Sequence, residues 1–407
     1  MLFKDVIGQQ QVKQHLIEMV QHNRLSHALL FLGKEGSGSL PLALAFANYI
    51  CSIPSSTNPE PVASLFGEPV EVKLPSTADE ADAWMEKHPS FSKTQALVHP
   101  DIHYSYPTIK RDPKHEKPIS TDFIVNWREF VQQYPYGNVF DWLQFIGAEN
   151  KQGNITAHEC NDIIRQLNLK SFESGYKILL MWMPEYLGKE GNKLLKLIEE
   201  PPADTLFILV AESEEKILST ILSRCQLIKI PSIDLPDIEK QLISKANCTK
   251  EQAKLIANAS NGNYREALHL LQHADEDFSS LLRDWMNATL KNQTSSQVRI
   301  IEELARIGRE RQKQFLKHFT HLIEQAIRLQ VSNDLMKSKL ETSMSSGEFE
   351  FIAKMNKAMN LEQKQAVSEE IDKATYHIER NANAKILFHA LTIKIFYIVK
   401  HNLVPSV

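Results

Sequence analysis

Short apolar runs alternate with helix-like segments over the first half of the chain. Three runs have an apolar core of strand length: SHALLFLG at 26–33, YKILLMWM at 176–183 and LFILVA at 206–211. Continuous runs of this kind are typical of strands buried on both faces of a parallel sheet. Helices are predicted at 42–50 and at 192–198, where a pair of prolines ends the pattern. The alternation predicts an α/β fold with a parallel sheet and helices on both faces.

Beyond Pro231 the strand-like runs mostly stop and the chain becomes helical. Short helices are predicted at 236–246, 249–259 and 264–273, and the chain reads as helical from about 278 to its end. The last predicted helix, at 384–399, is rich in β-branched residues but too long for a strand. Two capping-box patterns mark helix starts: Thr156 with Glu159, and Thr249 with Gln252.

Residues 52–98 differ from their surroundings because they are rich in proline, serine, threonine and acidic residues and have little periodicity. Such a stretch is typical of a surface excursion. A second charged stretch with prolines spans 110–118. We therefore expect an insertion at about 52–150 within the α/β region.

Length and composition limit the class of protein. A chain of 407 residues is expected to form two or three domains, and its apolar and charged fractions of 43% and 24% are those of a globular protein. The net charge of −4 argues against coating nucleic acid through positive charge alone. No uncharged apolar run of 18 residues predicts a membrane span, and the first residues lack a secretory pattern. Four scattered cysteines indicate a reduced, cytoplasmic protein.

The loop GKEGSGSL at 33–40 carries the glycines of a phosphate-binding loop without its charged chemistry. The working pattern is G-x-x-x-x-G-K-[ST], and Gly33 and Gly38 stand at its spacing, with Gly36 between them. Ser39 stands where the lysine belongs, and Leu40 where the magnesium-binding hydroxyl belongs. A strand precedes the loop and a helix follows it, which is the context that a phosphate loop requires. The sequence thus predicts the frame of an ATPase without its activity.

Ser223, Arg224 and Cys225 form the most specific string in the chain. Together with the glycine loop, this string resembles the Ser-Arg-Cys motif of clamp-loader subunits within the AAA+ superfamily. Further segments resemble the same family in the right order: its N-terminal box at 3–16, the helix after its Walker B strand at 192–202, its sensor 2 helix at 262–268 and its last collar helix at 379–387. The resemblance covers nearly the whole chain except 52–150. It implies an AAA+ domain at 1–231, a small helical lid domain at 232–277 and an all-α collar domain at 278–407.

Other positions that matter for hydrolysis in this family are also altered. The Walker B strand normally ends in Asp-Glu, which holds Mg²⁺ and polarises water, but Trp182 and Met183 stand there. Glu185 follows two residues late, and its expected role is that of a solvated or helix-N-terminal carboxylate. Sensor 1 normally offers two threonines, but here it reads Ala211 and Glu212.

Two arginines of the family pattern remain. Arg224 matches an arginine finger, which stabilises charge on the γ-phosphate bound by a neighbouring subunit. Arg265 matches the sensor 2 arginine, with a structural ion pair or an interface contact as the alternative role.

These residues imply a subunit without ATP cofactor or hydrolysis, and the resemblance implies that it supports loading of the sliding clamp onto primed DNA. The resemblance further implies that it joins the gamma/tau ATPase subunits and the delta subunit in the DNA polymerase III holoenzyme, meets the clamp and primed DNA through that complex, and contacts no membrane. Two alternatives remain: an active gamma/tau-type ATPase, which Ser39 disfavours, and a free-standing DNA-binding module, which the acidity disfavours.

Two further roles come into question for the range 52–150: a zinc site and a surface that stacks nucleic-acid bases. Some family members carry a four-cysteine zinc module here, but only Cys51 matches it, and His99 and His103 do not complete four ligands; we expect no metal. An aromatic-rich stretch could stack bases, but basic residues are few, so packing against the main domain is favoured. Its members are Trp127, Tyr134, Tyr136, Phe140 and Trp142.

Overall fold

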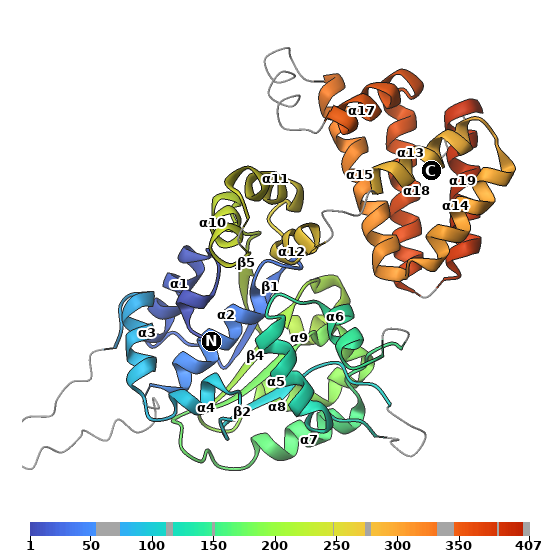
Figure 1. The fold of residues 1–407 in the computed structure, drawn as a ribbon. Coiled ribbons are helices and arrows are strands. Elements are labelled where there is room, and N and C mark those ends of the chain that lie inside the picture. The colour runs from blue at the N-terminus through green and yellow to red at the C-terminus, as the bar shows by residue number, and fades with distance from the viewer. Residues whose placement is uncertain are drawn as a thin grey trace, which may run out of the picture. The chain divides into compact units, whose positions relative to one another are not determined.

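The computed structural model describes residues 1–53, 74–110, 117–148, 151–246, 248–272, 278–331, 346–380 and 382–401. The chain divides into two compact units, at Met1–Gln272 and His273–Val407. Figure 1 shows the first unit as a twisted sheet covered by helices and the second as a helical bundle. Residues 54–73 of the proline-rich stretch and 111–116 of the second stretch lie outside the described residues. Within the described ranges, every helix is too short or too polar to span a membrane.

A five-stranded parallel sheet forms the centre of the first unit. Its strands lie in the order β2-β3-β4-β1-β5, and every neighbouring pair is parallel. The strands are β1 (Ala28–Gly33), β2 (Ile102–Ser105), β3 (Lys177–Trp182), β4 (Thr205–Ala211) and β5 (Gln226–Ile230). The three apolar runs of the sequence are therefore the three central strands, β3, β4 and β1. The predicted α/β fold is confirmed.

Helices cover both faces of this sheet, because successive side chains of each strand point to opposite sides. Leu29 and Phe31 of β1 join one apolar core, and Ala28 and Leu30 join the other. The helices around the sheet are α1 (Gln10–Gln21), α2 (Ser39–Cys51), α3 (Ala78–Lys87), α4 (Phe91–Gln95), α5 (Ile124–Gln133), α6 (Val139–Phe145), α7 (Ala157–Leu167), α8 (Leu195–Glu199) and α9 (Ser219–Leu222). Short 3₁₀ turns are η1 (Phe3–Asp5), η2 (Ser120–Phe123), η3 (Pro184–Tyr186), η4 (Gly188–Leu194) and η5 (Glu214–Lys216).

Three further helices complete the first unit, and we call them the lid helices. They are α10 (Leu235–Ala246), α11 (Lys250–Ser260) and α12 (Tyr264–Gln272), close to the predicted ranges. The capping box that opens α11 is present, with Thr249 and Gln252 as its two members. The lid helices belong to the same compact unit as the sheet, so their separation at residue 231 as a domain of their own stays a prediction.

The second unit is all-helical, as expected. Its helices are α13 (Phe278–Leu290), α14 (Thr294–Arg306), α15 (Arg309–Val331), α17 (Ser346–Ala358), α18 (Leu361–Glu379) and α19 (Ala384–His401). Trp285 is fully buried in its core, packs against Phe315 and Phe388, and donates a hydrogen bond from Nε1 to Thr392 Oγ1 at 2.9 Å. The β-branched segment at the end of the chain is the helix α19, as predicted, but only one face of it is buried, since Ile386, Ile393 and Tyr397 are exposed.

The structure corrects the insertion expected at 52–150. This range contains β2, an integral strand of the sheet that pairs in register with β3, from Ile102 opposite Ile178 to Ser105 opposite Met181. It also supplies α5 and α6, which belong to the main core. The segment looked irregular because β2 has only four residues and begins directly after His99 and Pro100, which hide its periodicity.

Two smaller local predictions were incomplete. Strand β5 was not predicted, because it is an edge strand in which Gln226, Leu227 and Lys229 are exposed and no continuous apolar run results. Thr156 caps α7, but Glu159 does not complete the capping box. Its carboxylate accepts hydrogen bonds from the Ser120 hydroxyl and backbone N–H, both at 2.7 Å. Burial raises the pKa of Glu159, and these hydrogen bonds oppose that shift.

The aromatic cluster under α5 and α6 should dominate the stability of the first unit. Trp127 is fully buried and stacks on Tyr106 with ring centres 4.2 Å apart. We expect Trp127→Ala to lower the free energy of unfolding of this unit by about 3–5 kcal/mol, because it leaves a large cavity. Chemical denaturation followed by circular dichroism measures this. The control Phe172→Ala changes an aromatic that is 80% exposed and should shift stability by no more than about 0.5 kcal/mol; equal effects of the two variants would contradict the assignment.

Candidate functional site

The glycine loop connects β1 to α2 at the carboxyl end of the sheet, where ligands of open α/β sheets bind. Gly36 and Gly38 have φ angles of +70° and +90°, which side-chain-bearing residues rarely adopt. Gly33 has no room for a side chain, because a Cβ atom there would lie 2.4 Å from Ser39 Oγ and 2.5 Å from Ser37 Oγ. The turn itself therefore requires the glycines, whether or not a phosphate binds.

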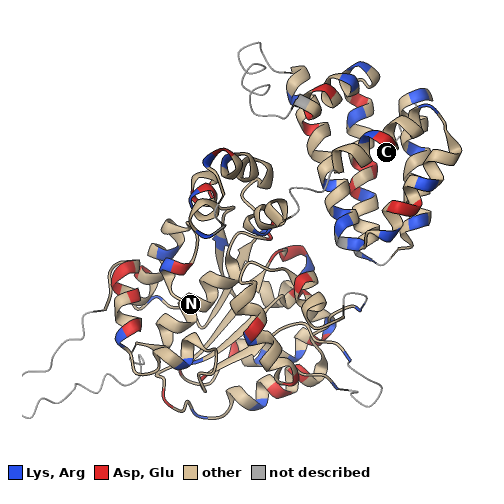
Figure 2. Cartoon of the chain, viewed as in Figure 1, with Lys and Arg blue, Asp and Glu red and all other residues tan. Residues whose placement is uncertain are grey.

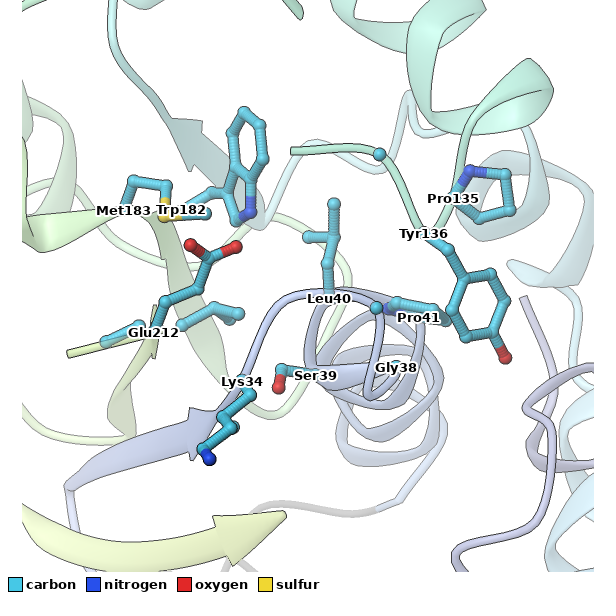
Figure 3. Close-up of a pocket in the computed structure, with 15 residues that line it drawn as sticks. Lys34, Gly38, Ser39, Leu40, Pro41, Pro135, Tyr136, Trp182, Met183 and Glu212 are labelled. Carbon is cyan, nitrogen blue, oxygen red and sulfur yellow. The ribbon is translucent and has the colours of Figure 1, made fainter. Parts of the chain in front are cut away.

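The two positions that should carry charge or bind magnesium face inward. Ser39 is 8% exposed, and its hydroxyl shares a 3.0 Å hydrogen bond with that of Ser37. Leu40 is 4% exposed, and Figure 3 shows its side chain between Trp182 and Glu212 on one side and Tyr136 on the other. Lys34, the cation within the loop, extends away from this group of side chains (Figure 3). A leucine thus occupies the space beside the loop where a hydrated metal ion would need oxygen ligands.

The residues at the Walker B positions belong to the hydrophobic core. Trp182 ends β3 and is 2% exposed; its ring centre lies 5.2 Å from that of Trp127 and 6.0 Å from that of Phe130. Met183, which is 3% exposed, has a φ of +59° and begins the turn into η3. Neither side chain offers an oxygen for a metal or a base for water.

Glu185 lies after the end of β3 and organises the neighbouring strand end. Its Oε1 accepts hydrogen bonds from the backbone N–H groups of Glu212 at 2.6 Å and Ser213 at 3.0 Å. Burial raises the pKa of Glu185, and the backbone hydrogen bonds oppose that shift. Glu185 stands in the first turn of η3, as expected for a helix-N-terminal carboxylate, and in addition it binds the loop after β4.

Ala211 and Glu212 stand at the sensor 1 positions, and both line the same cavity as the glycine loop. The Glu212 side chain still reaches solvent at the rim of that cavity. Desolvation by the surrounding protein, with the nearby carboxylates of Glu35 and Glu185, raises its pKa to about 8. The carboxylates of Glu35 and Glu185, which contribute to this shift, would also repel a polyphosphate at the site.

Residues 134–142 close the site from the side opposite the sheet. Tyr136 lies over the loop, so close that a Cβ atom on Gly38 would be 3.1 Å from its ring. Pro135, Tyr136, Trp182 and Glu212 line the remaining cavity together with the loop, and its volume is about 30 Å³. That volume holds one or two water molecules, whereas small-molecule sites measure about 300–1,000 Å³. A nucleotide therefore has no space here in the conformation described.

Arg265, at the sensor 2 position in α12, is 4% exposed and fully engaged by carboxylates. Its Nε and Nη2 donate to the two oxygens of Asp141 at 2.5 and 2.7 Å, and its Nη1 donates to Glu35 Oε1 at 3.2 Å. Asp141 belongs to α6 and Glu35 to the glycine loop. Of the two roles left open by the sequence, the geometry matches the structural ion pair.

Arg224 lies elsewhere, after α9, and is not among the residues that line the cavity. Its Nε donates to Glu199 Oε1 at 2.6 Å, its Nη2 contacts the same oxygen, and its Nη1 donates to the Thr220 carbonyl at 2.6 Å. The side chain is 32% exposed. Ser223 Oγ accepts from Arg224 Nη1 at 3.3 Å, and burial raises the pKa of the Cys225 thiol to about 11. The Ser-Arg-Cys string thus forms a supported guanidinium at the surface of the chain.

The remaining candidates from the sequence are placed in the main body. Cys51 and Cys160 are buried, and His99 pairs with Glu173 at 3.2 Å. In the part of the chain that the structure describes, no three side chains of His, Cys, Asp and Glu converge to hold a metal ion. Trp127, Trp142 and Tyr136 are buried, which confirms packing over base stacking for them, although Tyr134 remains 47% exposed. Figure 2 shows basic and acidic residues interspersed along the helices of both units.

Sequence reasoning missed the residues that fill the site. Glu35 could have been identified from the sequence, because an acidic side chain inside a phosphate loop opposes phosphate binding. Asp141 and Tyr136 could not be identified in this way, because Tyr136 stands 98 residues after Gly38, Asp141 stands 124 residues before Arg265, and both belong to a segment that was read as an insertion. Only the paths of α5 and α6 bring them to the glycine loop.

Comparisons with known proteins agree on one family. Residues 76–234 match the model described as DNA polymerase III, delta subunit. The chain is 24% identical over 263 residues to the DNA polymerase III subunit delta′ of Bacillus subtilis, covering 64% of this chain and 59% of that one. It is 32% identical over 149 residues to the DNA polymerase III subunit gamma of Buchnera aphidicola subsp. Schizaphis graminum, covering 35% and 40%.

The chain therefore spans 59% and 40% of the length of these two curated relatives. Among solved structures, a DNA polymerase III gamma subunit-related protein of Thermotoga maritima is similar with a TM-score of 0.39 and 13% identity, covering 93% of this chain and 98% of that one.

Restoring the two loop residues should not restore hydrolysis. In the double variant Ser39→Lys with Leu40→Thr, we expect phosphate release from ATP to stay at the level of the unchanged chain, because Trp182 and Met183 supply no metal ligand. A coupled phosphate-release assay measures this, with Ser39→Ala and Leu40→Ala together as the control for folding. Appreciable, magnesium-dependent turnover in the restored variant would refute the interpretation of a silent site.

Proposed function

Because the chain belongs to the delta/delta′ clamp-loader family of DNA polymerase III, we propose that it acts as a clamp-loader subunit of the delta′ type. Such a subunit does not hydrolyse ATP itself. It supports the ATP-driven loading of the sliding clamp onto primed DNA by completing the site of a neighbouring ATPase subunit. Its proposed partners are the gamma/tau ATPase subunits and the delta subunit, and it meets clamp and DNA through the assembled complex.

One observation carries the choice of a non-hydrolysing subunit: side chains at the hydrolytic positions are part of the core. Leu40, Trp182 and Met183 are each less than 5% exposed. Replacing Trp182 by an acidic residue would place a charge among Trp127 and Phe130, which is costly without a partner. The lack of a lysine and of acidic residues at the hydrolytic positions therefore follows from the packing of the core. A single mutation would not restore hydrolysis.

Arg224 is the residue proposed to act on the neighbour. Its guanidinium is positioned by Glu199 and by the Thr220 carbonyl, yet it remains partly exposed at the surface. An exposed ion pair of this kind contributes only about 0–1 kcal/mol, so an incoming phosphate can compete for the guanidinium at little cost. Arginine pairs especially well with phosphate, because its planar fork can donate two parallel hydrogen bonds.

The second candidate function is that of an active ATPase of the gamma/tau type, which the likeness to gamma subunits favours. The two candidates differ in nucleotide affinity of the isolated chain. A delta′-type subunit with a cavity of about 30 Å³ should bind no ATP at micromolar concentration, and a gamma/tau-type subunit should bind it with Mg²⁺.

Isothermal titration of the full chain with Mg·ATP distinguishes these candidates. We expect no heat of binding up to a concentration on the order of 100 μM, because Leu40 and Tyr136 occupy the site. A purified gamma-type subunit under the same buffer conditions is the positive control. A dissociation constant in the micromolar range for this chain would favour the ATPase instead.

Substitution of Arg224 tests the proposed action in trans. We expect Arg224→Ala to leave folding intact and to lower ATP turnover at the neighbouring site of the reconstituted complex by on the order of 10³-fold or more, as for other arginine fingers. Stopped-flow phosphate release with clamp and primed DNA measures this. Arg165→Ala is the matched control, since Arg165 is also exposed and paired with a carboxylate, Asp162. Unchanged turnover in an assembled complex that contains the Arg224 variant would refute the finger.

A further inference from the structure

We propose that Asp141 and Glu35 act as a built-in counter-ion of Arg265 and, together with Tyr136, latch the lid helices α10–α12 onto the sheet without any nucleotide. The latch consists of these four residues. It deepens the picture of the silent site but does not rest on the proposed function, because it concerns only contacts within the first unit. It would hold whether or not Arg224 serves a neighbouring subunit.

The polar half of the latch is a bidentate ion pair. Two nitrogens of Arg265 donate to the two oxygens of Asp141, and the third donates to Glu35. The side chains of Arg265, Asp141 and Glu35 are 5%, 15% and 29% exposed. This partial burial strengthens the attraction relative to a surface pair, and the parallel hydrogen bonds add directional specificity. Each of the three guanidinium nitrogens therefore donates to a carboxylate of the same chain.

The carboxylates are themselves held in place. Asp141 is the third residue of α6, and its Oδ2 accepts the backbone N–H of Asn138 at 3.0 Å while its own N–H donates to Asn138 Oδ1 at 3.0 Å. Asn138 Nδ2 donates to Glu35 Oε2 at 2.9 Å, and Asn263 Nδ2 donates to Glu35 Oε1 at 3.2 Å. A capping box on α6 and two amides thus orient both acids toward α12.

The apolar half of the latch is Tyr136. It is 8% exposed and packs in the core of the lid helices, where its ring meets that of Tyr264 edge-on with centres 5.0 Å apart. Its hydroxyl accepts the backbone N–H of Ile7 at 2.8 Å. One side chain therefore joins the lid, the N-terminal segment and the glycine loop, which it touches at Gly38.

The glycine loop also contacts the lid directly through its backbone. The N–H of Tyr264 donates to the carbonyl of Gly36 at 3.1 Å, and a Cβ atom on Gly36 would collide with Asn263 at 1.9 Å. The start of α12 therefore rests on the loop at the place where a phosphate would enter. A triphosphate could bind only by displacing Asp141 and Tyr136 from these contacts. The closed lid is thus built into the fold, and no ligand is needed to hold it.

Hydrogen–deuterium exchange of the full chain tests the latch. Asp141→Asn keeps the size and a hydrogen-bond acceptor but removes the charge that faces Arg265. We expect amide exchange in α10–α12 to rise at least tenfold, exchange in β1, β3 and β4 to stay unchanged, and Mg·ATP to give the unchanged chain no added protection. Asp162→Asn, which alters an exposed ion pair with Arg165, is the matched control and should leave the lid unaffected.

Two outcomes would overturn the latch: lid exchange in Asp141→Asn equal to that of the unchanged chain, or added lid protection when Mg·ATP binds that chain. If Asp141→Asn does not fold, Arg265→Lys carries the test, because it keeps the charge but loses the bidentate geometry. We expect a smaller rise in lid exchange for this variant, and no rise would overturn the proposal. Adding Arg265→Met to Asp141→Asn should change exchange less than Arg265→Met alone, as coupled partners do.

Discussion

The packing of Trp182 against Trp127 and Phe130 determines what the carboxyl end of the sheet can do. β3 ends at the point where an acidic pair would hold a metal, and a tryptophan fills that point with an apolar ring. The aromatic rings of α5 and α6 cover the end of β3. The segment between these two helices then lies against the glycine loop, where Tyr136 contacts Gly38. A site built around core packing cannot also desolvate and bind a charged cofactor.

Electrostatics follows from this arrangement. Position 39 has no lysine, and Arg265 in α12 is the cation that pairs with Asp141 and Glu35. In a nucleotide-binding protein, an arginine at this position would be free to bind phosphate. In this chain it is paired with the carboxylates of Asp141 and Glu35. Arg224 differs because its ion pair lies at the surface, where water weakens the attraction and leaves the guanidinium available.

Much of the fold could be predicted from local patterns, and the failures have physical causes. The runs around Leu30, Leu180 and Ile208 predicted the three central strands, since only strands buried on both faces are apolar throughout. β5 escaped because alternate residues of an edge strand face solvent, and β2 because it has only four residues. The glycine loop was located because its spacing is local, whereas the contacts of Glu185 were missed because its partners lie in the loop after β4, 27 and 28 residues away.

The sequence by itself determined the strand–loop–helix frame, the positions of the altered hydrolytic residues and the Ser-Arg-Cys string, because each depends on residues close together along the chain. Only the tertiary structure decided what occupies the frame. Asp141 lies 124 residues before Arg265, and Tyr136 lies 129 residues after Ile7, so no periodicity or spacing connects them. Their meeting depends on how α5 and α6 pack against the sheet, which is a property of the whole core and not of any one segment.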